Sequence, residues 1–178
     1  MVSDPVGPEE LRERFGLEPL PLEGGWFRQT WSAAAGADGR PLGTAIIVLL
    51  STADGQFSAM HRLPTDEIWH FHSGDPVELL LLTEDDNSHR KVLLGDPADG
   101  DTPQLVVPAG AWMGGIPTGP RGWSMFSCTM TPGFLPEDYE GGSREELTER
   151  FPEAADDIAR LTRPGEALRF PDSATEPP

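Results

Sequence analysis

Short apolar stretches alternate with turn residues along most of the chain. Gly, Pro and Asp turns separate them, so that the stretches recur every 8–15 residues. This rhythm predicts a series of short strands and is typical of an all-β sandwich or barrel. A further strand is predicted from Trp26 onward, after the Gly24-Gly25 turn. The remaining predicted strands cover residues 44–50, 57–63, 67–72, 77–83, 90–94, 104–107 and 122–131.

Helical spacing is confined to the two ends of the chain. Leu11 and Phe15 lie four residues apart behind a Pro in the first turn, which predicts a short helix that Gly16 ends. Near the other end, Ser143 with Glu146 forms a capping box, so a helix is predicted through about residue 150.

The chain is expected to form one domain, because its 178 residues suit a single core. We place this domain at residues 1–152. Residues 153–178 are expected to hold a second C-terminal helix, over 153–161, and an acidic, Pro-rich tail. The polar and Pro-rich composition of residues 169–178 predicts disorder there.

The charge balance limits the partners of this protein. With 30 acidic and 13 basic residues, the net charge is -17, which repels nucleic acids and anionic membranes. No apolar run approaches the ~20 residues of a membrane span. The single cysteine, Cys128, excludes an intramolecular disulfide. We therefore expect a cytoplasmic protein without nucleic-acid or membrane partners.

Three of the four histidines fall within twelve residues, and their surroundings have a recognisable spacing. Gly55, His61, Glu67 and Gly74 match the pattern Gly-x5-His-x-His-x3-4-Glu-x6-Gly, with Leu63 in place of the second His. The sequence here resembles the first motif of the cupin superfamily. The segment 108–113 resembles the second motif, Pro-x-Gly-x2-His, with Met in place of its His.

A narrower resemblance covers residues 11 to 151. The matching segments are 61–63, 66–71, 74–76, 107–112, 131–134 and 137–139, and in them the chain resembles the DUF985, or cupin-5, family. One departure is Pro21, where that family usually has His, and another is Gln29, where it usually has Glu. The resemblance implies a double-stranded β-helix (cupin jelly roll) with a pocket for one small ligand, and a homodimer.

The resemblance also raises the question of a metal, since cupin metal sites use three His and one Glu. Only His61 and Glu67 remain at those positions. Leu63 cannot bind a metal, and the thioether of Met113 is a soft ligand that suits Cu(I) better than Fe(II) or Mn(II). His70 and His72 have the opposite strand parity to Glu67 and are expected on the outer face. We therefore expect no tightly bound cofactor; the alternative is divalent Fe, Mn, Zn or Ni at His61 and Glu67.

Without a metal, His61 and Glu67 are candidate catalytic residues that face the same interior. Trp69 and Phe71 share the parity of Glu67, and a carboxyl group among aromatic rings has a raised pKa. Such a pair can transfer protons. The alternative is a buried structural pair. Ser58 has the opposite parity to His61 and is expected to be a structural hydroxyl.

Further candidates for ligand contact come from two other segments. Trp112 and Met113 follow the Pro-x-Gly turn that brings the second motif to the barrel mouth, so both are expected to contact a ligand there. Arg28 and Trp26 share one face of an early strand, and they contact a ligand if that face points inward. Trp69 and Phe71, which share the parity of Glu67, complete the set of candidate ligand contacts.

These residues favour a metal-independent enzyme that acts on a small polar metabolite, sugar-like or with a keto group. The resemblance extends to metal-free cupin sugar epimerases, in which a pocket His removes a proton next to a keto group, so we expect isomerase, epimerase or lyase chemistry. Two alternatives remain: a cupin that binds a small ligand without catalysis, and a metal-dependent cupin enzyme with a reduced ligand set.

Overall fold

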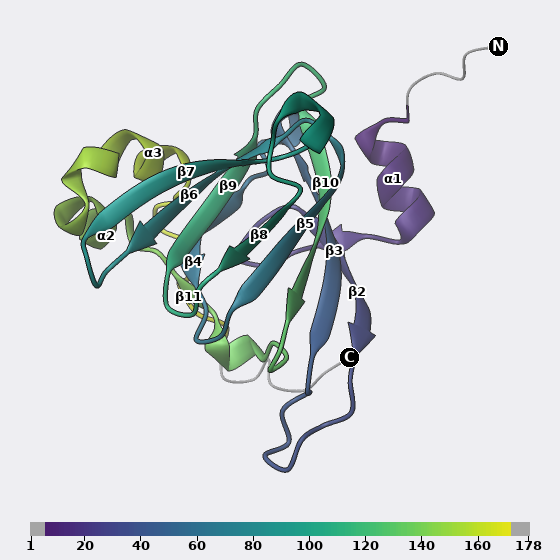
Figure 1. Cartoon of the computed structure of the whole chain (residues 1–178), viewed down its shortest axis with the longest axis horizontal. Coiled ribbons are helices and arrows are strands. Elements are labelled where there is room, and N and C mark those ends of the chain that lie inside the picture. Colours follow the sequence, from purple (N-terminus) through teal and green to yellow (C-terminus); the bar gives the residue numbers. More distant parts are fainter. Residues whose placement is uncertain (1–5, 172–178) are drawn as a thin grey trace.

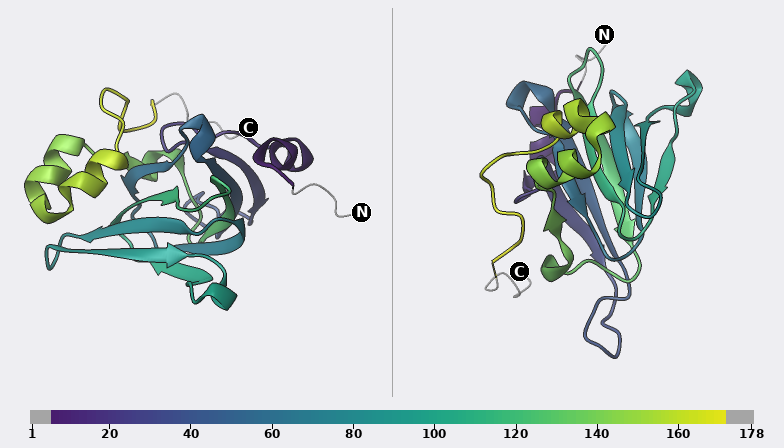
Figure 2. Two further views of the ribbon diagram at one scale, coloured as in Figure 1. Left: turned by 90° about the horizontal axis from the view of Figure 1, so that it is seen from above. Right: turned by 90° about the vertical axis from the view of Figure 1, so that its left-hand side faces the viewer.

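The computed structural model describes residues 6–171 and contains two antiparallel β-sheets that pack face to face (Figure 1). Figure 2 shows the two sheets from above and from the side, with the C-terminal helices beside one of them. Strands close in the sequence are often placed in different sheets, as in a jelly roll. The predicted all-β jelly roll with short terminal helices is confirmed.

The first sheet has six strands, and most of their bounds agree with the predicted ones. In spatial order they are β1 (Glu18–Pro19), β2 (Trp26–Ser32), β3 (Thr44–Ser51), β10 (Trp123–Met130), β5 (Glu67–Gly74) and β8 (Gln104–Val107).

The second sheet has five strands, two of which the sequence pattern did not predict. In spatial order they are β11 (Glu140–Gly141), β4 (Ser58–Arg62), β9 (Trp112–Pro117), β6 (Val77–Thr83) and β7 (Ser88–Leu94). The strands that were missed are β11, which has only two residues, and β9, in which Gly114 and Gly115 resemble a turn. A Cβ on Gly114 would lie 2.7 Å from the sulfur of Met60, so this glycine serves the close packing of β9 on β4.

Short helices lie at the ends of the chain, as predicted. They are α1 (Pro8–Phe15), α2 (Arg144–Arg150) and α3 (Ala155–Arg160). Short 3-10 turns occur elsewhere along the chain: η1 (Thr52–Asp54), η2 (Pro97–Asp99), η3 (Pro136–Asp138) and η4 (Pro152–Ala154). The Ser143 hydroxyl accepts a hydrogen bond from the amide of Glu146, which confirms the predicted N-cap. Of the helices within residues 6–171, none has the length and apolar character needed to cross a membrane.

Three apolar clusters hold these layers together. The largest fills the space between the sheets and includes Trp69, Met113 and Phe126. The second joins α2 and α3 to the outer face of the five-stranded sheet, and the third joins α1 to the outer face of the six-stranded sheet. The barrel interior is thus mainly packed side chains rather than open space.

The chain beyond α3 returns to the barrel, contrary to part of the disorder prediction. Residues 169–171 were expected to be disordered, but Phe170 packs edge-on against Tyr139, with ring centroids 5.5 Å apart. Arg169 pairs with Glu140 of β11 at 3.1 Å. An aromatic side chain with a buried partner outweighs the polar composition around it. Residues 172–178 lie outside the described residues.

Candidate functional site

His61 lies on β4 and is buried, with only 1% of its surface exposed. Its Nδ1 lies 2.8 Å from the carbonyl oxygen of Ala59. Because a carbonyl can only accept, Nδ1 carries the proton in the neutral ring and Nε2 keeps its lone pair. The ring of Tyr139 stacks on the imidazole, with centroids 5.3 Å apart and planes at 16°. The imidazole is thus fixed with Nε2 as its reactive atom.

Glu23 faces that reactive nitrogen from the loop between β1 and β2. Its Oε2 lies 4.0 Å from Nε2 of His61, and its Oε1 accepts a hydrogen bond from the Ser58 hydroxyl at 2.8 Å. The loop is held in a tight conformation, since Leu22 has a φ of 63°. The backbone carbonyl of Glu23 accepts from the amide of Ala59 at 2.8 Å. Glu23 is therefore held by both its side chain and its backbone next to the imidazole.

Glu67 is the second carboxyl group of the site and begins β5. It is 6% exposed, and its Oε2 accepts a hydrogen bond from the indole N–H of Trp69 at 2.8 Å. Burial raises the pKa of Glu67 to about 7, and the charge of Glu23 acts in the same direction. His61 and hydrogen bonds from Trp69 and Cys128 oppose this rise in the pKa. Glu67 therefore exists in both protonation states near neutral pH.

The position of Ser58 corrects the expectation from strand parity. The pairing of β4 with β9 shifts its register between Ser58 and His61, so a bulge interrupts the alternation. Ser58 consequently reaches Glu23, within the same group of residues as His61. Strand alternation applies only where the pairing is regular, and here it is not.

Three of the predicted ligand contacts lie in the barrel interior. Trp69 is fully buried and stacks on Phe126 with ring centroids 4.6 Å apart. Met113 is 1% exposed, pairs with His61 across β9 and β4, and belongs to the same cluster. Phe71 is partly buried against this cluster. The structure brings these three side chains to the interior that His61 and Glu67 share.

Trp112 lies on the opposite face of β9 from Met113, outside the barrel. It belongs to the cluster under α2 and α3. Its indole N–H donates to Glu84 at 3.1 Å, and the guanidinium of Arg62 lies 4.5 Å from its ring centre. The predicted place at the barrel mouth is therefore wrong, because adjacent residues of a strand point to opposite faces.

Trp26 and Arg28 also lie outside the barrel, on the outer face of β2. Trp26 packs in the α1 cluster, and the guanidinium of Arg12 lies 4.2 Å from its ring centre. Arg28 is exposed on the same face. The predicted contact of Trp26 and Arg28 with a ligand required their side chains to point into the barrel, and in the structure both point outward.

The outer face of β5 carries His70 and His72, as predicted. The amide of Gln104 donates to Nδ1 of His70 at 3.0 Å, and the other ring nitrogen lies 3.0 Å from the Thr129 hydroxyl. Nε2 of His72 lies 2.9 Å from the hydroxyl of Ser127. A register shift occurs near His72, but this bulge does not turn the side chain inward.

The side chains present do not fit the metal centre that the resemblance implies. Leu63 and Met113 replace two imidazoles, and both are packed in the apolar core. Within the described part of the chain, no group of three or more His, Cys, Asp or Glu side chains is arranged to hold a metal ion. His61 and Glu67 alone offer two of the usual ligands.

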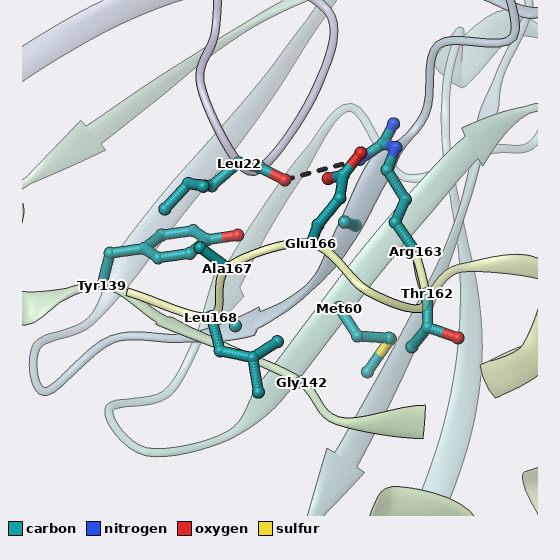
Figure 3. A pocket seen from close by; sticks show the side chains of 11 residues that line it. Leu22, Met60, Tyr139, Gly142, Thr162, Arg163, Glu166, Ala167 and Leu168 are labelled. Carbon is teal, nitrogen blue, oxygen red and sulfur yellow. Dashed lines mark hydrogen bonds between the residues drawn. The ribbon is translucent and has the colours of Figure 1, made fainter. Parts of the chain in front are cut away.

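A small surface hollow lies beside Tyr139 and the residues that follow α3 (Figure 3). Tyr139, which stacks on His61, forms one wall of it, and Leu22 and Leu168 are nearby walls. Tyr139 therefore separates His61 from the surface hollow, at the end of the barrel where β11 pairs with β4.

The comparison with protein families agrees with this arrangement of sheets and motifs. A family model, Cupin_5, described as "Cupin superfamily (DUF985)", matches residues 9–141. The chain belongs to this family. No functionally curated protein matches the chain.

Solved structures place this Cupin_5 protein among proteins of the same fold. A protein from Shewanella oneidensis is 31% identical, with a TM-score of 0.82, over 90% of this chain and 99% of that one. A hypothetical protein from Leishmania major is 29% identical, with a TM-score of 0.79, over 88% and 99%. An oxalate decarboxylase from Bacillus subtilis, a protein with Mn(II) centres, is 14% identical with a TM-score of 0.54. It covers 86% of this chain and 39% of that one, and shows the fold alone.

Two residues of this candidate site, Glu23 and Tyr139, were not among the predicted site residues. Glu23 lies within the segment 21–25, where the sequence departs from the usual family pattern, and Tyr139 ends one of the matching segments. Each comes from a loop or turn far from His61 in sequence. Both segments carried a family signal, but only the folded chain brings them to the imidazole.

Proposed function

We propose that this cupin is a metal-independent acid–base catalyst for a small polar metabolite, in which His61 and Glu67 transfer protons. The observation that carries the proposal is the fixed orientation of His61, whose Nδ1 is held by the Ala59 carbonyl while Nε2 faces Glu23. A base needs a lone pair aimed at the reacting proton and a partner for the charge that develops. His61 has a fixed ring whose Nε2 keeps its lone pair, and Glu23 is a partner for the positive charge.

The reaction that suits these groups is proton removal next to a carbonyl group. Nε2 of His61 takes a proton from carbon, and the electron pair of the broken C–H bond moves toward the carbonyl oxygen. Glu67 in its protonated form donates a proton to that oxygen, and return of a proton to carbon completes an isomerisation or epimerisation. The charge of Glu23 stabilises the imidazolium formed in the first step.

The two carboxyl groups have different roles because their surroundings differ. Glu67 has a pKa of about 7 through burial, so it can both give and accept a proton at neutral pH. Glu23 holds its position through Ser58 and acts as a positioning residue for the imidazole. Burial also raises the pKa of Tyr139, which remains a neutral phenol beside His61.

Exchange of carbon-bound protons in D₂O tests this proposal without knowledge of the natural substrate. The full chain, with a chelator present, is incubated with a panel of neutral ketoses and α-hydroxy ketones, and loss of the α-proton signal is followed by NMR. We expect His61→Asn and Glu67→Gln to lower the exchange rate by roughly 100-fold or more. His89→Asn, which changes an exposed residue of β7, is the matched control.

Three other results would contradict the proposal in different ways. Equal exchange rates for the unchanged protein and His61→Asn would remove His61 from the reaction. Exchange that appears only when Mn(II) or Fe(II) replaces the chelator would favour the metal-dependent alternative. Shifts of the Tyr139 and His61 signals on addition of a ketose, without exchange, would favour a cupin that binds a ligand and does not catalyse.

A further inference from the structure

The groups of the proposed site are enclosed. His61 is 1% exposed and Glu67 is 6% exposed, so neither is open to a ligand in this arrangement. Tyr139 covers His61 by stacking on its ring, and Tyr139 is itself 4% exposed. The edge of the Tyr139 ring meets Phe170, which comes from the end of the described chain. A ligand must displace part of this cover to reach Nε2.

The outermost layer of the cover is a short segment, residues 166–171, which we name the strap. It runs past Tyr139 and along the hollow, and Ala167 and Leu168 form part of the wall (Figure 3). The family model ends at residue 141, so the strap lies outside the part of the chain that it matches. The strap is therefore an addition to the matched barrel that covers its site.

Few interactions hold the strap in place. The amide of Gly141 donates to the carbonyl of Leu168 at 2.7 Å, and Arg169 pairs with Glu140. The Arg169 side chain is 61% exposed, so this ion pair is weak. The strap residues are exposed except for Phe170, which is half-buried. Segments with little buried surface and few protected hydrogen bonds open most readily.

The chain just before the strap is, in contrast, firmly attached. The guanidinium of Arg163 donates to the backbone carbonyls of Glu23 at 2.7 Å and Phe57 at 3.0 Å, and it lies 3.9 Å from the Phe57 ring centre. Gly165, with a φ of 85°, forms a turn between this attachment and the strap. Arg163 is thus a fixed point next to the Glu23 loop, and the strap is the part free to move beyond the turn.

We propose that the strap is a lid that moves away from Tyr139 to admit a ligand to His61 and Glu67, and that it turns at Gly165. The role of the interior as a ligand site rests on the proposed function, whereas the movement of the strap does not. Since Arg163 stays attached, Glu23 keeps its place beside His61 when the strap opens. The lid thus changes access without changing the geometry of the acid–base groups.

Amide hydrogen exchange tests the movement with an internal control. Gly141 donates to the strap, whereas the neighbouring Gly142 donates to the carbonyl of Met60 on β4, each at 2.7 Å. Opening of the strap releases only the first of these amides. We expect Gly141 to exchange at least 10-fold faster than Gly142 in the full chain, measured by NMR. Equal protection of the two glycines would overturn the proposal.

The single cysteine reports whether opening gives access to the site. Cys128 is 4% exposed, pairs with Trp69 across β10 and β5, and packs in the same interior cluster as Met113, so a reagent that reaches its thiol has entered the barrel interior. We expect Phe170→Ala to speed its reaction with methyl methanethiosulfonate, a small neutral reagent, by at least 5-fold. Leu93→Ala is the control, because it truncates a partly exposed apolar side chain of β7 outside the strap.

The variants separate local opening from unfolding of the whole chain. Rates are compared with the free energy of unfolding in urea, and Arg169→Ala, which removes only the exposed ion pair, serves as a second strap variant. Equal Cys128 rates in the unchanged chain and both strap variants would overturn the lid. Because this readout needs no turnover, a positive result here together with no exchange in D₂O would contradict the proposed function alone.

Discussion

The two faces of β5 carry similar polar residues in opposite surroundings. On the inner face, Glu67 is packed with Trp69, and burial raises its pKa to about 7. On the outer face, His70 and His72 contact neutral groups and, at His72, solvent. The same strand thus holds a group suited to proton transfer and a pair of surface histidines. The face of the strand, rather than the spacing of residues in the sequence, decides the chemistry.

A similar contrast separates His61 from His70. The Nε2 atom of His61 faces the carboxylate of Glu23 at 4.0 Å, whereas both nitrogens of His70 contact neutral side chains. Only the inner histidine has a partner for the charge that arises when it accepts a proton.

The largest expected effect is a loss of stability when packing is removed from the inner face of β5. Trp69→Ala removes a fully buried indole that stacks on Phe126 and donates to Glu67. We expect a loss of about 3–5 kcal/mol in the free energy of unfolding in urea. His72→Ala, on the outer face of the same strand, is the control and should cost less than about 0.5 kcal/mol. Similar losses for both would contradict the contrast between the faces.

A smaller effect is expected from the titration of Glu67. Its pKa is about 7 in the fold against 4.5 as the ordinary value, so the folded chain binds the proton more tightly than the unfolded chain. Stability from this group is complete below pH 4.5 and is lost as the pH rises through 7. Relative to Glu67→Gln, the unchanged protein should lose roughly 3 kcal/mol across this range.

Urea unfolding of the two proteins at several pH values between 4 and 8 measures this difference directly. The amide of Glu67→Gln keeps an acceptor for the Trp69 indole, so the comparison isolates the titration. Parallel stability curves for the two proteins would show that the carboxyl group of Glu67 has an ordinary pKa in the fold.

The strands that the sequence predicted well are the regular ones. Residues 77–83 and 104–107 have the predicted bounds, and the inner position of Trp69 and the outer position of His70 follow from alternation in a regular part of β5. Where a bulge interrupts β4, the same argument misplaced Ser58. Periodicity thus predicts a face only between irregularities, and a single sequence does not indicate where the bulges occur.

The candidate site was only partly predictable for a second reason. His61 and Glu67 belong to one motif, but Glu23 and Tyr139 reach the imidazole through loops whose conformation depends on tertiary contacts. The Glu23 loop is fixed by Arg163, which lies 140 residues further along the chain. No local pattern contains such a contact, so these residues are identified only in the folded chain.

The smallest expected effect concerns the outer face alone. Partial burial and, to a smaller extent, the charge of His70 hold the pKa of His72 below its ordinary value of 6.5. His70→Gln removes that charge and should raise the pKa of His72 toward 6.5, as followed by the NMR shift of the His72 ring proton. The same substitution should leave proton exchange by His61 unchanged, because His70 lies on the other side of the sheet from Glu67. An unchanged pKa of His72 would mean that burial alone sets it. A change in the rate of substrate proton exchange in D₂O would mean that the two faces of β5 are coupled.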